Sequence, residues 1–396
     1  MNRLLRISFD TLLTSLTPIL GWFLLGILVD KNLINIFSLI YPIQFIICTI
    51  KSIFGTGANV SSIRDNNKNS VYSGIIIGSI IGAIILGIIV VNIEKYISFM
   101  NMDIDTYKIF GTYGVIQMFL QLLLNLSLCK LYFEDENKRA NKYSFLFNII
   151  NFSSLIILSI ITKEQIIIAG ITTIISSIFV AIMLFRLVKR TKIQINILNC
   201  IKYDAVELFH EISMFIIYLF GFKTAFNFGE KYILAISFSD LITDTQWDVA
   251  YSIKILAQID ITKKVFSYKE HIKNSRKLIY ILIASVVVMG TILYPFYKTD
   301  IPVTLIITII GLICLCMYPV YVTKMTFLQM EYSAMKATIS KQIANILRII
   351  CSFLPTPFCT TIGLMISATY QLLSTNYYIT KNKLNMEMRE EREAKT

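Results

Sequence analysis

Long apolar stretches alternate with short polar segments along the whole chain. Each stretch is close to the roughly 20 residues that an α-helix needs to cross the hydrocarbon layer of a membrane. The pattern therefore predicts an all-α, polytopic integral membrane protein with twelve transmembrane helices. The predicted spans are residues 11–30, 33–55, 71–92, 109–130, 143–162, 166–188, 207–229, 232–254, 278–297, 301–323, 338–355 and 358–380.

Positive charge falls on every second polar segment. The N-terminus, the segments 51–70, 130–142, 186–202, 254–277 and 324–341, and the residues after 380 hold 29 of the 37 Lys and Arg residues. The six connectors between them hold only seven. Because Lys and Arg concentrate on cytoplasmic loops, we expect both termini in the cytoplasm. A composition rich in Ile, Asn and Lys further predicts a bacterial cell membrane.

Composition agrees with a membrane location. The chain is 55% hydrophobic and 16% charged, with a mean hydropathy of +0.66, whereas soluble proteins average about 25% charged residues. The net charge of +12 lies in short loops rather than on one patch, so it predicts orientation in a membrane and no nucleic-acid partner. The seven cysteines lie mostly inside apolar stretches and indicate buried apolar positions, not a disulfide framework.

A basic segment near the middle divides the spans six and six. We therefore predict an N-terminal six-helix bundle (1–190), a cytoplasmic linker (191–206), a C-terminal bundle (207–380) and a charged cytoplasmic tail (381–396). A weak internal repeat leaves duplication open; at an offset of 197 the matching pairs are Leu131 and Leu328, Glu134 and Glu331, Ala140 and Ala337, and Asn148 and Asn345. Transporters built from such repeats bind substrate between their halves.

Glycines in the third span favour close helix packing. Gly74, Gly78, Gly82 and Gly87 recur at about four-residue spacing and leave room for a neighbouring helix. We interpret them as structural rather than functional.

Three acidic residues lie within the eighth span. Asp240, Asp244 and Asp248 are four residues apart and share one stripe of a helix, with Asp244 near the middle of the membrane. Ionisable groups at that depth are costly and usually functional, and like charges raise one another's pKa. The stripe therefore predicts a proton relay or a site for cationic ligands. The alternative is that this segment lies partly at an interface or in a re-entrant stretch.

Other polar side chains interrupt the apolar spans. Arg348 in the eleventh span needs a counter-charge, which one of the three aspartates would supply, unless it snorkels to the interface. Gln117 and Gln121 form a stripe on the fourth span that either lines a cavity or bonds helix to helix. The two histidines, His210 and His271, do not make a metal site.

Six short motifs occur in the order of a known family. They are Leu28–Asp30, Gly55–Ser62, Asn148–Asn151, Ala169–Ser176, Glu211–Phe215 and Ala257–Gln258. Together they resemble the multidrug and toxic-compound extrusion (MATE) family, a branch of the multidrug/oligosaccharidyl-lipid/polysaccharide (MOP) exporter superfamily. The chain is similar to a short, divergent member of that family, and the resemblance implies a MATE-like fold of two six-helix bundles.

The resemblance also implies a coupling site. Asp30, Asn151 and Thr173 would bind H⁺ or Na⁺ in the N-terminal half, and Glu211 matches an acidic residue that opens helix 7 of the family. Two expected acids are missing, because Leu155 stands four residues after Asn151 and the tenth span has no Asp. With a single formal charge the site would favour H⁺ over Na⁺.

We expect a secondary transporter that exports an amphipathic or cationic small molecule from the cytoplasm by alternating access, in antiport with H⁺ or Na⁺. The alternatives are a flippase for a lipid-linked saccharide and an intramembrane prenyltransferase, whose Mg²⁺-binding motif the Asp240–Asp244 spacing resembles. No second acidic motif of that spacing, nucleophile elbow or phosphate-binding loop occurs, so we do not expect an enzyme. The expected partners are membrane lipids and a small-molecule substrate, with no cofactor besides the coupling ion, and the expected state is a monomer.

Overall fold

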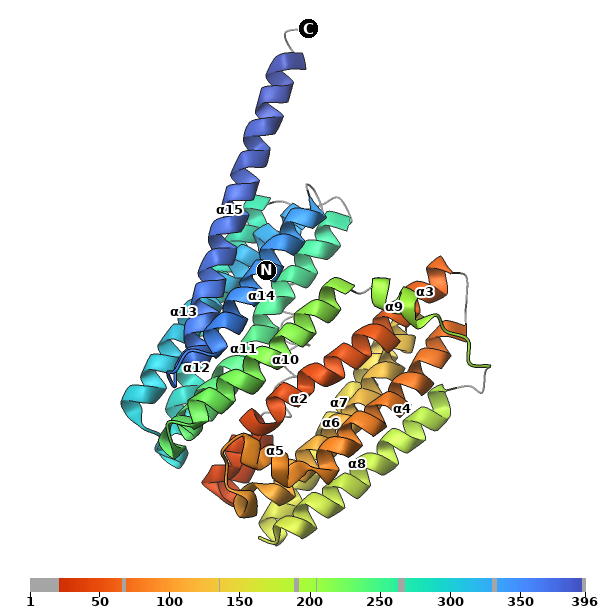
Figure 1. Ribbon diagram of the computed structural model, residues 1–396, viewed down its shortest axis with the longest axis vertical. Coiled ribbons are helices and arrows are strands. Elements are labelled where there is room, and N and C mark those ends of the chain that lie inside the picture. The colour runs from red at the N-terminus through yellow and green to blue at the C-terminus, as the bar shows by residue number, and fades with distance from the viewer. Residues whose placement is uncertain are drawn as a thin grey trace. The chain divides into compact units, whose positions relative to one another are not determined.

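The computed structural model describes residues 21–65, 69–134, 136–188, 192–203, 205–262, 268–329 and 333–393. Every regular element within these ranges is a helix (Figure 1). The contacts divide the chain into two compact units, one ending at Ser237 and the other beginning at Phe238. We call them the N-terminal unit and the C-terminal unit.

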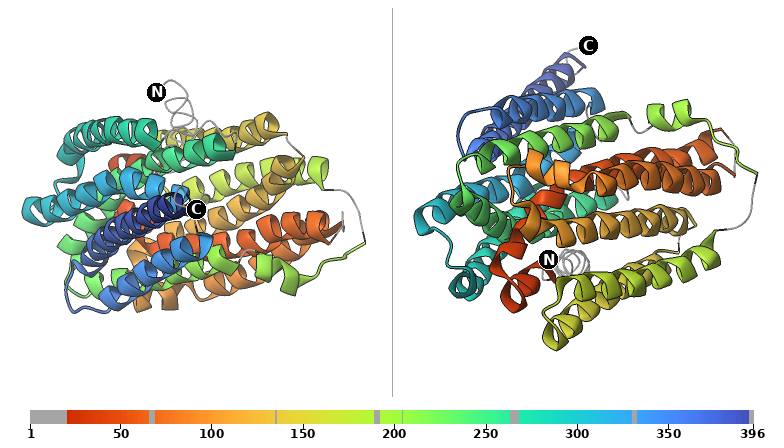
Figure 2. Two further views of the ribbon diagram at one scale, coloured as in Figure 1. Left: turned by 90° about the horizontal axis from the view of Figure 1, so that it is seen from above. Right: turned by 60° about the horizontal axis from the view of Figure 1, so that its bottom comes forward.

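The N-terminal unit is built around α6, which packs against α2, α4, α7 and α8, while α10 packs on α2. Figure 2 shows these helices from two further directions. Residues 21–28 are helical. The elements that follow are η1 (Lys31–Ile34), α2 (Asn35–Lys51), η2 (Ser52–Gly57), α3 (Ala58–Arg64), α4 (Asn69–Val91), α5 (Ile93–Phe99), α6 (Ile104–Phe133), α7 (Asn137–Ile161), α8 (Gln165–Leu187), α9 (Ile197–Tyr203) and α10 (Ala205–Phe226).

The C-terminal unit is a second set of long helices. α13 packs against α12 and α15, and α14 packs against α15. α15 extends past α13 and α14 toward the C-terminus in Figure 1. The elements are α11 (Glu230–Thr262), whose first turns belong to the N-terminal unit, then α12 (Tyr268–Tyr297), α13 (Ile301–Phe327), α14 (Ala334–Ser352) and α15 (Cys359–Glu393).

Within the described ranges, eight helices are long and apolar enough to cross a membrane. They are Lys31–Ile63, Asn69–Val91, Ile104–Leu131, Lys138–Ile161, Gln165–Leu187, Leu208–Phe226, Glu270–Tyr297 and Ile301–Phe327. Three further predicted spans coincide with α11, α14 and α15, which carry more charged or polar residues. The first half of the first predicted span, residues 11–20, lies outside the described residues. The all-α, polytopic membrane fold is confirmed.

Helix α10, which begins where the predicted linker 191–206 ends, belongs to the unit that ends at Ser237. Aromatic rings hold α10 on α2: the Tyr41 and Tyr218 ring centroids are 4.7 Å apart, and Phe45 stacks on Tyr218 at 5.4 Å. Such aromatic pairs stabilise a protein by more than the burial of their apolar area alone provides. The predicted division at 191–206 stays a prediction.

Three of the four glycines of α4 lie where another helix leaves no room for a side chain. A Cβ on Gly74 would lie 2.2 Å from the Phe54 carbonyl oxygen, and one on Gly78 would lie 2.8 Å from the Phe54 Cβ. A Cβ on Gly82 would lie 2.2 Å from a Leu122 methyl carbon, whereas Gly87 has no neighbour within 4 Å. The packing interpretation is therefore confirmed at all but Gly87.

The Gly55-Thr56-Gly57 motif forms a turn of π-helix, η2, between α2 and α3. A Cβ on Gly55 would lie 2.8 Å from the Cys129 sulfur of α6, and one on Gly57 would lie 2.6 Å from the Cys200 carbonyl oxygen of α9. Asn59, just beyond the turn, donates a hydrogen bond to the Cys129 carbonyl at 2.9 Å. The glycines of this motif therefore allow α2, α6 and α9 to meet closely.

Gly74 and Gly87 of the same helix provide a matched test of this packing. We expect Gly74→Ala to lower the free energy of unfolding by about 1–3 kcal/mol, because the added methyl group overpacks the contact with Phe54. Gly87→Ala should leave stability unchanged or raise it by up to about 1 kcal/mol, because alanine favours helix. Thermal unfolding in detergent measures both, and equal melting temperatures for the two variants would contradict the assignment.

Candidate functional site: a polar cavity in the N-terminal unit

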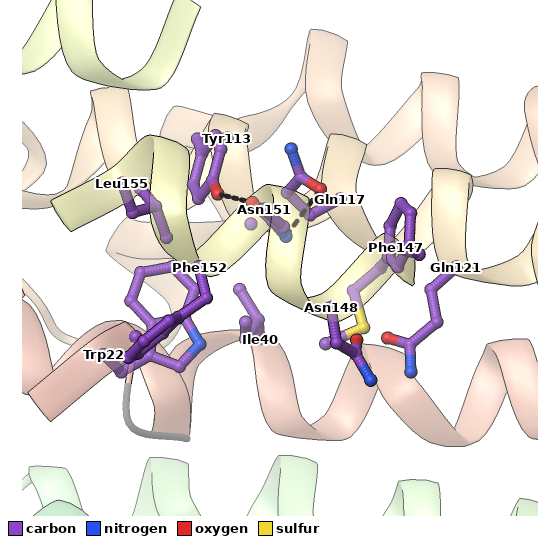
Figure 3. Close-up of a pocket in the computed structure, with 13 residues that line it drawn as sticks. Trp22, Ile40, Tyr113, Gln117, Gln121, Phe147, Asn148, Asn151, Phe152 and Leu155 are labelled. Atoms are coloured by element: carbon purple, nitrogen blue, oxygen red, sulfur yellow. Dashed lines mark hydrogen bonds between the residues drawn. The ribbon is translucent and has the colours of Figure 1, made fainter. Parts of the chain in front are cut away.

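A cavity of about 60 Å³ lies within the N-terminal unit. Its wall comes from the helical residues before η1 and from α2, α6 and α7 (Figure 3). This volume holds a few water molecules or one small chemical group. The lining residues are Gly21, Trp22, Ile40, Tyr113, Gly114, Gln117, Met118, Gln121, Phe147, Asn148, Asn151, Phe152 and Leu155.

A chain of hydrogen bonds crosses one wall of the cavity. The Tyr113 hydroxyl donates to Asn151 Oδ1 at 2.8 Å, and Asn151 Nδ2 donates to Gln117 Oε1 at 3.1 Å (Figure 3). Because Asn151 uses both its oxygen and its nitrogen, it joins α6 to α7 and fixes the orientation of the Gln117 amide.

Gln117 retains an unused donor. Its side chain is only 8% exposed, and its Nε2 has no hydrogen-bond partner among the described residues. A buried donor without a partner costs roughly 1–3 kcal/mol. Gln121, one turn further along α6, lines the same cavity. The two glutamines therefore add amide groups to the α6 side of the cavity wall.

Aromatic rings form the rest of the wall. Trp22 meets Tyr113 edge-to-face with the ring centroids 6.0 Å apart. Phe147 and Phe152 of α7 line the cavity as well. Amide groups beside aromatic rings suit a ligand that is partly apolar and partly hydrogen-bonding.

The described part of the cavity wall carries no charged side chain. Leu155, which occupies the position of the acid expected from the family resemblance, is buried and lines the cavity. Hard cations such as Na⁺ prefer carboxylate oxygens. The described lining is thus better suited to neutral polar groups than to a hard metal cation such as Na⁺.

The structure brings some of the predicted coupling residues to the cavity and not others. Asn151 lines it, whereas Asp30 and Thr173 do not. The Asp30 carboxylate instead accepts a hydrogen bond from the backbone N–H of Asn32 at 2.9 Å and caps η1. Thr173 is half-buried on α8. A joint site of the three residues therefore stays a prediction.

The polar stripe on α6 has both of the roles that its spacing predicts: it lines a cavity and it bonds one helix to another. Gln117 and Gln121 line the cavity, and Gln117 also bonds to α7 through Asn151. The sequence reasoning missed Tyr113 and Trp22. Tyr113 lies four residues before Gln117, so the i, i+4 spacing of the stripe was the signal that could have found it.

The acidic stripe lies on one continuous helix, α11. Asp240 is half-buried, while the side chains of Asp244 and Asp248 lie outside the part that the structure describes. Hydroxyl groups gather next to Asp240: Thr308 of α13 donates to Ser239 at 3.0 Å. The hydrogen bond from Thr308 to Ser239 joins α11 to α13 within the C-terminal unit.

The remaining predicted residues occupy separate helices. Glu211 is half-buried on α10, and Arg348 is half-buried on α14. A Cβ on Gly363 of α15 would lie 3.5 Å from the Arg348 carbonyl oxygen, so α14 and α15 cross closely at this arginine. The predicted pairing of Arg348 with an aspartate stays a prediction. Among described residues, no three His, Cys, Asp or Glu side chains gather into a possible metal site.

A double-mutant cycle tests the hydrogen-bond chain. We expect Tyr113→Phe and Asn151→Ala to destabilise the protein individually and to show a coupling energy of about 0.5–1.5 kcal/mol, because each removes the same bond. Tyr113→Phe combined with Gln121→Ala is the control, since Gln121 lines the cavity outside this chain. Thermal unfolding in detergent provides the free energies, and additive effects in both pairs would refute the network.

No family model and no curated protein matches the sequence. Solved structures match nearly the whole chain. An inward-facing multidrug-resistance MATE transporter of the MOP superfamily is 14% identical, with 93% of this chain and 95% of that chain covered and a TM-score of 0.66. An outward-facing multidrug-resistance MATE transporter is 15% identical, with 96% of each chain covered and a TM-score of 0.63. A MOP superfamily transporter from Pyrococcus furiosus is 16% identical, with 96% of each chain covered and a TM-score of 0.62. The resemblance suggested by the motifs is confirmed as a likeness of fold, and this chain has the fold of the MATE transporters.

Proposed function

We propose that this protein is a secondary transporter that exports an amphipathic small molecule from the cytoplasm by alternating access. The observation that carries the proposal is the likeness of fold to MATE transporters along 93% to 97% of the chain. The multiple apolar helices support a location in the membrane. We further propose that both termini face the cytoplasm, on the basis of the alternating Lys and Arg content, and that the cell is bacterial, on the basis of the composition rich in Ile, Asn and Lys.

The cavity of the N-terminal unit supports an amphipathic substrate. Its wall combines the rings of Trp22, Phe147 and Phe152 with the amides of Gln117 and Asn151. For the Pyrococcus furiosus transporter of the same fold, a reversed polarity of the binding pocket suggests a different function. Pocket polarity is therefore informative in this fold, and the neutral lining described here supports an uncharged or weakly charged substrate moiety more than a strongly cationic one.

Coupling would reside in carboxylates that change their protonation between two states of the transporter. Asp30 and Glu211 are the first candidates, and the α11 stripe with Asp240 is the second. A coupling ion drives export only if it binds the two states with different affinity. Leu155 at the cavity wall supports H⁺ over Na⁺, because a site with one carboxylate binds a proton fully but solvates Na⁺ poorly.

A flippase for a lipid-linked saccharide is the second candidate, because a different function is suggested for one MOP superfamily transporter of this fold. An export assay and a lipid-scrambling assay on the same proteoliposomes would separate the two. The likeness to transporters argues against the prenyltransferase, which would show Mg²⁺-dependent transfer of a prenyl group.

The coupling proposal predicts the effect of neutralising Asp30 or Glu211. We expect Asp30→Asn and Glu211→Gln each to abolish drug resistance in a pump-deficient host, because neither amide can bind and release the coupling proton. Both variants should still reach the membrane. Glu164→Gln, which alters an exposed carboxylate before α8, is the control and should export normally. Unchanged export in both test variants would refute coupling through these residues.

The α11 stripe predicts a different outcome. We expect Asp244→Asn to shift the range of exported compounds or the number of protons that enter per molecule exported, because it removes one of three like charges from a single helix face. Proton flux and substrate flux in reconstituted vesicles measure both quantities. If the Asp244→Asn protein exports the same compounds with the same number of protons, the stripe has a structural role and takes no part in transport.

A further inference from the structure

The connector between α8 and α10 is docked on the N-terminal unit. The backbone N–H of Gln194 donates to the Ser73 hydroxyl at 2.8 Å, and Asn199 Nδ2 donates to the Asp65 carboxylate at 3.1 Å. Cys200 is fully buried, and its carbonyl oxygen lies against Gly57 of η2. Residues 192–203, which we call the connector, are therefore held against η2, the end of α3 and the start of α4.

Three bulky apolar side chains of the connector are exposed, among polar ones. Ile193 is 57% exposed, Ile197 is 39% exposed and Leu198 is 78% exposed. Leu198 and the buried Cys200 are two residues apart on α9, which places them about 200° apart around the helix. One side of α9 thus packs on the protein while the other presents bulky apolar side chains, whose exposure to water is unfavourable.

The position of the connector in the chain indicates what covers its exposed apolar side chains. α9 has seven residues, too few to cross a bilayer. It follows α8, a candidate membrane span whose last turn ends with Phe185 at 90% exposure and the exposed Arg186. A short segment attached to the end of a spanning helix lies at the level of the lipid headgroups, where apolar side chains reach the acyl chains.

The positive charge of the connector favours lipids with anionic headgroups over neutral ones. Lys192 and Lys202 flank the apolar residues and are exposed. Neither forms an ion pair with a residue that the structure describes. Basic side chains beside an apolar face attract the anionic headgroups of a cytoplasmic leaflet.

We propose that the connector is an interfacial anchor that binds anionic phospholipid. Ile193, Ile197 and Leu198 enter the boundary between headgroups and acyl chains, and Lys192 and Lys202 contact the phosphate groups. Because the opposite side of α9 is packed on Gly57, this anchor holds the η2 turn at the membrane surface. The inference concerns lipid binding alone, so it does not depend on which substrate is exported.

The first test measures depth in the bilayer. Trp22→Phe and Trp247→Phe remove both native tryptophans, and Leu198→Trp or Glu134→Trp then adds a single one. Glu134 is the control, because it is an exposed polar residue after α6. In nanodiscs of phosphatidylcholine and phosphatidylglycerol with brominated acyl chains, we expect the Leu198→Trp protein to lose most of its tryptophan emission and the Glu134→Trp protein to retain it.

The second test measures the preference for anionic headgroups. We expect Lys192→Gln/Lys202→Gln to lower the affinity for phosphatidylglycerol relative to phosphatidylcholine about 25-fold at low salt, from roughly fivefold for each lysine. Native mass spectrometry of protein released from mixed nanodiscs provides the ratio. Lys95→Gln/Lys298→Gln, from connectors on the predicted opposite face, should leave it unchanged. Equal quenching of the tryptophans at positions 198 and 134 would overturn the proposal and would indicate that protein covers this face. An unchanged ratio of phosphatidylglycerol to phosphatidylcholine in Lys192→Gln/Lys202→Gln would overturn it as well.

Discussion

The N-terminal unit depends on one close contact, where α2, α4, α6 and α9 meet around the η2 turn. Gly55, Gly57 and Gly74 leave no space for a side chain at this contact. Apolar side chains gain little by leaving lipid for one another, so helix association in a membrane relies on close packing and hydrogen bonds. The turn supplies both, because Asn59 bonds to the α6 backbone beside it. The positions of α2 and α6, and with them two walls of the cavity, follow from this contact.

The cavity shows how the fold uses polar groups inside an apolar unit. Every buried polar atom needs a partner, and Asn151 provides one for both Tyr113 and Gln117. The Gln117 amide nitrogen has no hydrogen-bond partner among the described residues, so it is the exception to this rule within the chain of hydrogen bonds. The described lining contains no charged side chain, and Leu155 lies at the position where the family resemblance leads us to expect an acid.

Several sequence predictions correspond to observed features because they rest on local physics. The apolar periodicity of the spans predicts helices, since only intrahelical hydrogen bonds satisfy the backbone in a bilayer. The i, i+4 spacing of Gln117 and Gln121 predicts a shared face, and both side chains line one cavity. The glycine spacing of α4 predicts close packing, which the structure shows at Gly74, Gly78 and Gly82, whereas a Cβ on Gly87 would meet no described atom within 4 Å. A pattern on one helix indicates a face but does not identify its neighbour.

The sequence by itself determined the class of this protein, namely a chain of helices that cross a membrane, because length and hydropathy act on each segment separately. It also determined which residues share a helix face, since helix geometry is local. Only the tertiary structure decided that Asn151 joins Tyr113 to Gln117, that Asp30 caps η1, and that α10 packs with the N-terminal unit. Most of these are contacts between segments distant in sequence, and they depend on which helices approach most closely. That choice is made by packing of complementary surfaces, which no single segment contains.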